Sequence, residues 1–243
     1  MKKAFLPISL VSLLLAILPV VNASHMTPPA KEIVAAKIAE PETSLELATD
    51  LLYDSLKLNK IGLSRQALQY AYKGHQALIR KGLISKTNIL SVCDFSQSSE
   101  NKRFYIIDVK NFKVLMNTHV AHGKKSGLQY ASKFSNKMES HQSSLGFYVT
   151  KGTYKGKHGL SLRLTGVDKG FNSNAEKRAI VVHGAQYIGE NREDAVNMGR
   201  SFGCPAVPQA QSARVINLIK EGTCLFIYHP SKSYLHGSRI LNG

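Results

Sequence analysis

The chain has 243 residues, and its 32 Lys and Arg against 16 Asp and Glu give a formal net charge of +16. This length suits one mid-sized domain with an attachment, or two small domains, and allows a core of normal size without disulfides. The positive net charge predicts attraction to anionic polymers, although charge alone does not identify a function. The three cysteines exclude a fully paired disulfide framework, because one thiol is left over.

The N-terminus has the pattern of a secretory signal. Lysines at positions 2 and 3 precede an almost wholly apolar run over residues 4–21, and small residues follow where a signal peptidase cleaves. We therefore predict a cleaved signal peptide over residues 1–23 and a periplasmic or secreted protein. The alternative is an uncleaved anchor, since the run approaches the ~18 to 20 residues that span a bilayer, but Pro19 favours removal. No later segment is as apolar, so no stable membrane insertion is expected after cleavage.

The next part of the chain changes from a linker to helices. Residues 24–42 are polar and contain prolines, which predicts a linker. Apolar residues then follow helical spacing in two stripes, which predicts an N-terminal helical hairpin over residues 43–90. Gly62 is expected to end the first helix and Ser64 to cap the second.

The rest of the chain has the pattern of a mainly β domain over residues 91–230. Short runs rich in branched and aromatic residues are broken there by Gly, Asn and Lys. One further helix is predicted at residues 211–222, and residues 231–243 are expected to form a C-terminal tail. The expected strands cover residues 103–109, 113–123, 145–150, 160–166, 178–184 and 224–230.

One cysteine lies in a segment that must turn. Cys204 stands between a glycine and Pro205 in GRSFGCPAVP (199–208), where proline prevents a helix. His183 ends an expected strand, and strand ends hold side chains rigidly at surface clefts. A free thiol titrates near ~8.5, so a neighbouring imidazole is needed to activate it at neutral pH. From the residues alone, a catalytic thiol and an unpaired thiol on an ordinary surface turn are equally good hypotheses.

In these residues the chain resembles the L,D-transpeptidase catalytic domains of bacterial cell-wall synthesis, in their murein L,D-transpeptidase branch. The signature of the family is a strand-end histidine followed downstream by a Ser-x-Gly-Cys turn. The resemblance covers roughly residues 91–230 and implies a β-sandwich catalytic domain. Its elements are VAHGKKSG (120–127), SSLGFYVT (143–150), HGLSLRLTG (158–166), AIVVHGAQY (179–187) and GRSFGCPAV (199–207).

The chain departs from the commonest signature at two positions. Phe202 stands where a histidine is usual, and Ala206 stands where Arg or Asn is usual. A second imidazole near the thiol is therefore expected to be missing, which leaves His183 as the base.

The resemblance implies acyl transfer on peptidoglycan stem peptides. The Cys204 thiolate attacks the carbonyl at the L-centre of the diamino acid in a tetrapeptide stem, and the thioester passes to an amine or to water. His183 moves the proton. The Gly184 carbonyl orients His183, with Asp194 as the alternative, and the backbone amides of Gly203 and Cys204 bind the oxyanion. No cofactor and no nucleic-acid partner are expected.

Three other functions stay open at this point. They are an L,D-carboxypeptidase with water as acceptor, a hydrolase of links between the wall and an attached protein, and a non-catalytic wall-binding protein. Several further side chains are candidates for substrate contact, because of their place beside the motifs or because guanidinium groups bind carboxylates. These candidates are His122, Ser143, Ser144, Ser201, Arg200, Tyr187 and, with solvated surface charge as its alternative, Arg178.

Two remaining groups of residues suggest other chemistry. No HExxH or CxxC pattern accompanies His119, His122, His141 and His158, so no metal site is predicted. Cys93 and Cys224 lie at the edges of strand-like runs and are a candidate disulfide. Two buried free thiols are an equally good interpretation.

Overall fold

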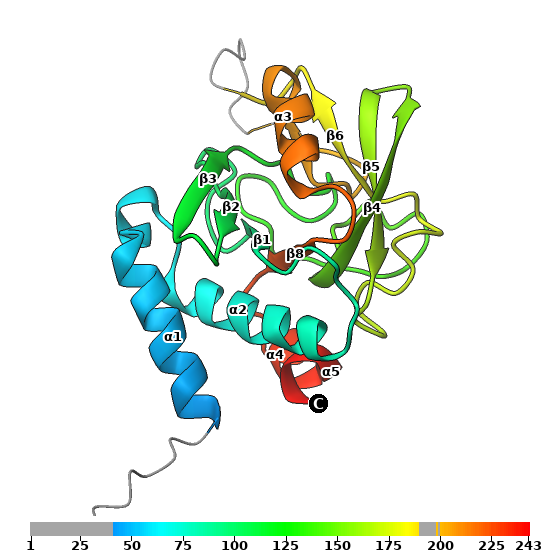
Figure 1. Ribbon diagram of the computed structural model, residues 1–243. Coiled ribbons are helices and arrows are strands. Elements are labelled where there is room, and N and C mark those ends of the chain that lie inside the picture. Colours follow the sequence, from blue (N-terminus) through cyan, green and yellow to red (C-terminus); the bar gives the residue numbers. More distant parts are fainter. Residues whose placement is uncertain (1–40, 190–197, 199) are drawn as a thin grey trace, which may run out of the picture. The chain divides into compact units, whose positions relative to one another are not determined.

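The computed structural model describes residues 41–189, 198 and 200–243. The predicted signal peptide and nearly all of the predicted linker therefore lie outside the described residues. The prediction of a mainly β domain is confirmed, because eight strands form one sheet in the order β3-β2-β1-β8-β4-β5-β6-β7 (Figure 1). The strands are β1 (Ile89–Asp94), β2 (Phe104–Asp108), β3 (Lys113–Thr118), β4 (Gly146–Gly156), β5 (Gly159–Gly166), β6 (Val181–Ala185), β7 (Ala206–Pro208) and β8 (Cys224–Tyr228).

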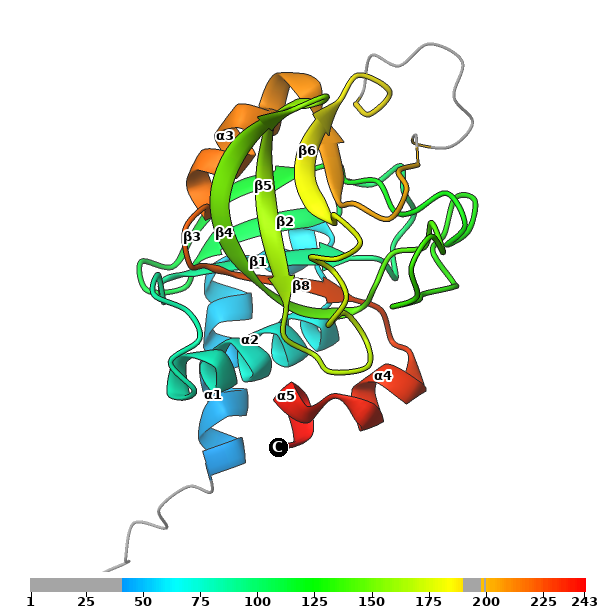
Figure 2. The same ribbon diagram turned by 90° about the vertical axis from the view of Figure 1, so that its right-hand side faces the viewer.

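The sheet curls until the chain beyond one edge meets the other edge. Just after β3, Ala121 forms an antiparallel bridge to Ala206 of β7, and Gly123 bridges Ser201. In Figure 2, β4, β5 and β6 lie in front, and β1, β2 and β3 cross behind them. This closure brings the chain after β3 beside the segment that precedes β7. That preceding segment contains the cysteine motif.

Helices cover the sheet. Their bounds are α1 (Pro41–Ser55), η1 (Leu58–Ile61, a 3-10 helix), α2 (Arg65–Arg80), α3 (Gln209–Ile219), α4 (Lys232–Gly237) and α5 (Arg239–Asn242). The predicted helical hairpin is α1 and α2. Gly62 ends η1, and Ser64 Oγ accepts a hydrogen bond from the Ala67 amide at 3.1 Å, as expected of an N-cap. α2 packs against β1 and β8, and its buried residues belong to the same apolar core as the sheet.

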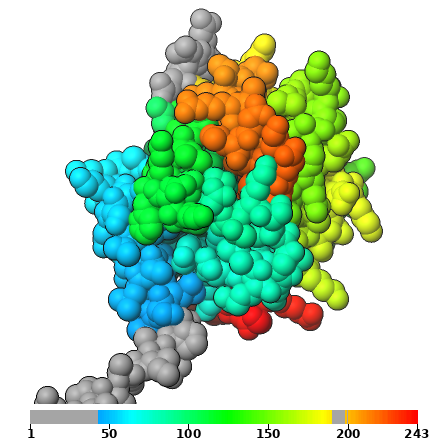
Figure 3. All heavy atoms as spheres, viewed as in Figure 1, coloured from blue at the N-terminus to red at the C-terminus, as the bar shows by residue number. Residues whose placement is uncertain are grey.

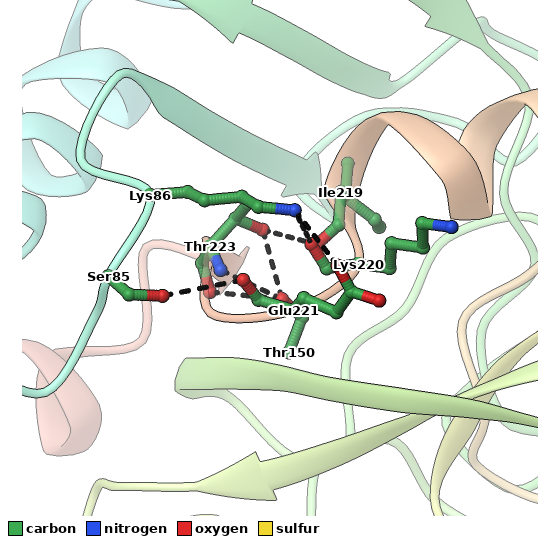
Figure 4. A network of polar contacts seen from close by, with 7 residues as sticks. All are labelled: Ser85, Lys86, Thr150, Ile219, Lys220, Glu221 and Thr223. Carbon is green, nitrogen blue, oxygen red and sulfur yellow. Dashed lines mark hydrogen bonds and ion pairs between the residues drawn. The ribbon is translucent and has the colours of Figure 1, made fainter.

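The predicted further helix is α3, which lies against β5, β6 and β7. Its C-terminal end is fixed by a network of polar contacts (Figure 4). The Lys86 ammonium donates to the Lys220 carbonyl at 2.9 Å, and the Thr223 hydroxyl lies 3.1 Å from the hydroxyl of Thr150. These contacts join the end of α3 to β4 and to the segment before β1. On the face drawn in Figure 3, the surfaces of α1 (blue), β3 (green) and α3 (orange) lie side by side.

The C-terminal residues are more ordered than a tail. They form α4 and α5, which the prediction of a single further helix missed because neither short helix has a periodic apolar pattern. The buried Asp168 carboxylate accepts hydrogen bonds from Tyr234 at 2.9 Å and from Ser238 at 2.6 Å. It also accepts the Phe147 amide at 2.9 Å, so both helices are tied to β4.

The candidate disulfide between Cys93 and Cys224 is wrong, because both are buried free thiols. In the parallel pair of β1 and β8, Cys224 lies opposite Leu90 and Cys93 lies opposite Ile227. The two cysteines are therefore three residues out of register, or roughly 10 Å along the strands. A disulfide needs Cα atoms within about 7 Å.

Candidate active site

The segment from Ser201 to Cys204 forms a turn that is held from two sides. On one side, the Ser201 amide donates to the His122 carbonyl at 3.0 Å, and the Ser201 carbonyl accepts the Lys124 amide at 2.7 Å. Within the turn, Ser201 Oγ donates to the Cys204 carbonyl at 2.6 Å and accepts the Gly203 amide at 3.0 Å. The serine of the motif thus fixes the backbone on both sides of the cysteine.

Gly203 is required by the shape of this turn. Its φ is 122°, a conformation that side-chain-bearing residues rarely adopt. A Cβ there would lie 2.8 Å from the Gln142 carbonyl oxygen. The expectation that the Gly203 amide binds an oxyanion is corrected, since that amide is already donated to Ser201 Oγ within the turn.

The pairing of β6 with β7 brings the cysteine turn near the histidine. The parallel pairing of β6 and β7 places His183 opposite Ala206, two residues beyond Cys204. This register corresponds to roughly 8 Å between the Cα atoms of His183 and Cys204. The partly exposed Cys204 sulfur accepts the Val181 amide at 3.5 Å and lies 3.7 Å from the Ala179 carbonyl oxygen. The Cys204 thiol therefore lies beside the first residue of β6, the strand that carries His183.

The buried His183 ring is held in one orientation by its own backbone. Nδ1 lies 2.9 Å from the Gly184 carbonyl oxygen. Because a carbonyl only accepts, Nδ1 carries the hydrogen and Nε2 has a free lone pair. A Cβ on Gly184 would lie 2.5 Å from Gln209 Oε1, so this glycine also lets the start of α3 approach β6. Asp194, the alternative partner, lies outside the described residues.

The surroundings shift the pKa values of both groups. Burial lowers the pKa of His183, and His158 and Lys157 lower it further, against the opposing effect of the Gly184 hydrogen bond. Burial raises the pKa of the Cys204 thiol, while the Val181 amide, Arg178 and Lys157 lower it. Both shifts favour the neutral form of the group, which is the form that each needs if the proton moves during attack.

A second imidazole lies against the ring of His183. His158, in the turn between β4 and β5, stacks on His183 with ring centroids 4.2 Å apart and planes at 21°. The sequence contains this residue in HGLSLRLTG, but no local pattern reveals that the turn reaches His183.

Phe202 itself forms part of the open surface next to the thiol. Its side chain is 60% exposed and stacks on His141 with ring centroids 4.7 Å apart. Lys124 Nζ lies 4.0 Å from the centre of the Phe202 ring, at cation–π distance. Tyr187 is 43% exposed, and desolvation of the covered part of its side chain raises its pKa, as does its interaction with Cys204.

Three candidates for substrate contact are buried and already paired. Arg103 Nη2 lies 2.7 Å from His122 Nδ1, and the other ring nitrogen is 3.3 Å from the Gly127 carbonyl. Burial and Arg103 lower the pKa of His122 to about 4. Ser143 Oγ donates to the Gly203 carbonyl at 3.4 Å, and Ser144 Oγ donates to a loop carbonyl at 2.8 Å. Because these three side chains are buried, the structure does not place them where a substrate could contact them. Their hydrogen bonds instead hold the turn and its neighbouring loops.

The two arginine candidates also bind loops. Arg200 Nη1 donates to the Gly127 carbonyl at 3.0 Å. Arg178 is half-buried, and its guanidinium donates to four acceptors of the loop over residues 135–144. Arg178 therefore presents no free fork for a carboxylate in this structure.

Residues 59–228 match the L,D-transpeptidase catalytic domain family, which is more than half of the chain. The chain belongs to this family. No curated protein matches it. Among solved structures, it is similar to an L,D-transpeptidase from Mycobacterium smegmatis at 15% identity and a TM-score of 0.36, over 58% of this chain and 59% of that one. It is also similar to an L,D-transpeptidase from Stackebrandtia nassauensis at 11% identity and a TM-score of 0.37, over 77% of this chain and 93% of that one.

The chain spans about three-fifths of the length of the Mycobacterium smegmatis protein. Within the described residues, this L,D-transpeptidase domain has no group of three or more His, Cys, Asp and Glu side chains that could hold a metal ion.

Proposed function

We propose that the protein is an exported peptidoglycan L,D-transpeptidase that forms crosslinks through a thioester at Cys204. The observation that carries this proposal is that β7, which directly follows the Cys204 turn, pairs with the strand that carries His183, whose Nδ1 is bound to the Gly184 carbonyl. Family membership supports the same chemistry.

In the proposed reaction, His183 Nε2 takes the thiol proton as the Cys204 sulfur attacks the carbonyl carbon at the L-centre of the stem's diamino acid. The tetrahedral oxyanion collapses, the bond to the terminal D-alanine breaks, and the leaving amine takes the proton from His183. The acyl group is then a thioester on Cys204. An amine of a second stem attacks it, gives a proton to His183 and releases the thiol, which regains that proton.

The oxyanion needs hydrogen-bond donors near the sulfur. Because the Gly203 amide is committed to Ser201 and Pro205 has no amide hydrogen, we propose the Cys204 amide as the backbone donor. Losing one such donor costs ~10² to 10³ in rate in other enzymes.

The charge around the site suits a substrate rich in carboxylates. The exposed Lys124, Lys125 and Lys157 lie near its aromatic or imidazole rings, as the cation–π contact at Phe202 and the pKa shifts of His141 and His183 indicate. Such a basic surface favours anionic ligands.

Export is proposed from the residue pattern at positions 1–23. In the part of the chain that the structure describes, no helix has the length and apolar character needed to cross a bilayer.

The test is turnover of a purified tetrapeptide stem, with and without an amine acceptor, followed by mass spectrometry. The wild-type protein should release D-alanine and form the crosslinked product, and C204A should form none. C93A, which removes a buried thiol outside the site, is the matched control and should retain activity.

Other product patterns would replace the proposal. A trimmed tripeptide without crosslink identifies an L,D-carboxypeptidase. Retained wall binding with no turnover by the wild type identifies a non-catalytic binder.

A further inference from the structure

Arg178 lies just before β6 and clamps a loop behind the nucleophile turn. Its Nη1 donates to the Ser135 carbonyl at 2.7 Å and to Ser144 Oγ at 2.5 Å. Its Nη2 donates to the Gln142 carbonyl at 2.7 Å and to Ser140 Oγ at 3.1 Å. The Arg178 side chain therefore links both ends and the middle of the loop over residues 135–144.

The acceptors around this guanidinium are all neutral. Half-buried cations usually pair with a carboxylate, because burial of an unpaired charge is costly. Among the described residues, the groups bonded to Arg178 are two backbone carbonyls and two hydroxyls. They satisfy the N–H groups without cancelling the positive charge, and burial lowers the pKa of Arg178 accordingly.

The unneutralised charge lies next to the cysteine. Arg178 Nη2 is 3.2 Å from the position that a Cβ on Gly203 would occupy. The two charges interact in both directions, since Arg178 lowers the pKa of Cys204 and Cys204 raises the pKa of Arg178. The other charged or titratable groups that act on these two are Lys157, Tyr148, Tyr187 and His141.

We propose that Arg178 is a positioning residue of the Cys204 site: its guanidinium holds the 135–144 loop against the Ser201–Cys204 turn and keeps a positive charge beside the sulfur where the thiolate forms. The inference deepens the proposed function and relies on it only for the identity of the reaction. Among the described residues, these contacts satisfy the half-buried guanidinium without an acidic side chain.

Two substitutions separate the charge from the clamp. R178K keeps a positive charge and loses the planar fork, whereas R178Q keeps polar donors and loses the charge. An opposite charge within ~4 to 6 Å lowers a pKa by about 1 to 3 units. The difference between the two variants therefore isolates the effect of the charge.

The experiment measures the rate of Cys204 alkylation by iodoacetamide against pH, with folding checked by thermal unfolding. The buried Cys93 and Cys224 should not react in the folded protein, and C204A supplies the background. R178Q should raise the apparent pKa of the reacting thiol by about one unit or more, and R178K by less than half of that. R80Q, at an exposed arginine on α2, is the matched control and should leave the profile unchanged. If R178Q does not fold, R178M replaces it as the neutral variant.

A folded R178Q that titrates like the wild type, or equal shifts in R178Q and R178K, would overturn the proposal. Because alkylation needs no peptidoglycan substrate, this result is independent of turnover. A wild type without transpeptidase activity but with the expected shift would remove the proposed function and leave the role of Arg178 intact.

Discussion

The imidazole rings of His158 and His183 are stacked, with their centroids 4.2 Å apart. His158 is exposed and lies in the tight turn between β4 and β5, whereas His183 is buried and lies on β6. The stack covers one face of the proposed base, and His158 and its neighbour Lys157 both lower the pKa of His183.

The H158A variant should shift the acid limb of activity. Removing the stacked ring exposes His183 to water and removes a neighbour that opposes its protonation, so the pKa of His183 should rise toward its ordinary value of ~6.5. In the wild type, kcat/KM should rise through a pKa below that value, and in H158A the limb should move to higher pH. H236A, at an exposed histidine on α4, is the control. An acid limb that stays in place in H158A would show that the stack does not tune the base.

The S201A variant should lower turnover more than substrate affinity. Ser201 Oγ holds the Cys204 carbonyl and the Gly203 amide, and each lost hydrogen bond of this kind costs about 1 kcal/mol. We expect kcat to fall about tenfold to a hundredfold with little change in KM, and S201T, which keeps the hydroxyl, to recover most of it. Equal kinetics for S201A and the wild type would contradict a positioning role for this hydroxyl.

The G203A variant should fold less stably and lose activity. At φ 122° a side chain is strained by about 1 to 3 kcal/mol, and its Cβ would press on the Gln142 carbonyl. Urea unfolding should show this loss. G152A is the control, since a Cβ on Gly152 meets nothing within 4 Å. A G203A protein as stable and as active as G152A would mean that the turn has another shape.

Acid should destabilise the fold through two buried histidines. Burial lowers the pKa of His75 to about 4, and burial with Arg103 lowers that of His122 to about 4. A histidine in the unfolded chain titrates near ~6.5, so below that pH the unfolded state binds more protons and the free energy of unfolding falls. Each histidine should contribute a loss of about 3 kcal/mol by pH 4.

The H75L variant isolates one of these groups. It replaces the buried imidazole by an apolar side chain and should lose roughly half as much stability as the wild type between pH 7.5 and pH 4.5 in urea unfolding. H236L should lose as much as the wild type, because His236 is exposed. The same acid loss in H75L as in the wild type would exclude His75 as a source.

The sequence predicted the elements whose patterns are local. The helical hairpin, the Ser64 cap and the strand before His183 follow from periodicity and capping chemistry. β1 was missed as a separate strand, and β7 was missed because its three residues include a proline and are too few to show a pattern. The cysteine pair was mispredicted because strand register is invisible in the sequence.

The two proposed catalytic residues could be chosen from the sequence, but their surroundings could not. His183 and Cys204 are marked by strand and turn chemistry and by family resemblance. The contact of His158 with His183, and that of Arg178 with its loop, join segments far apart in the chain. The commitment of the Gly203 amide depends on a backbone turn geometry that residue types alone do not specify.

The most direct test of the central claim is intact-protein mass spectrometry after brief incubation with a tetrapeptide stem and no amine acceptor. The account predicts a mass increase equal to the stem minus its terminal D-alanine, located on Cys204 by peptide mapping, present in the wild type and absent in C204A. H183A should accumulate the adduct at least a hundredfold more slowly. An adduct on another residue, or D-alanine release by C204A at the wild-type rate, would contradict the account.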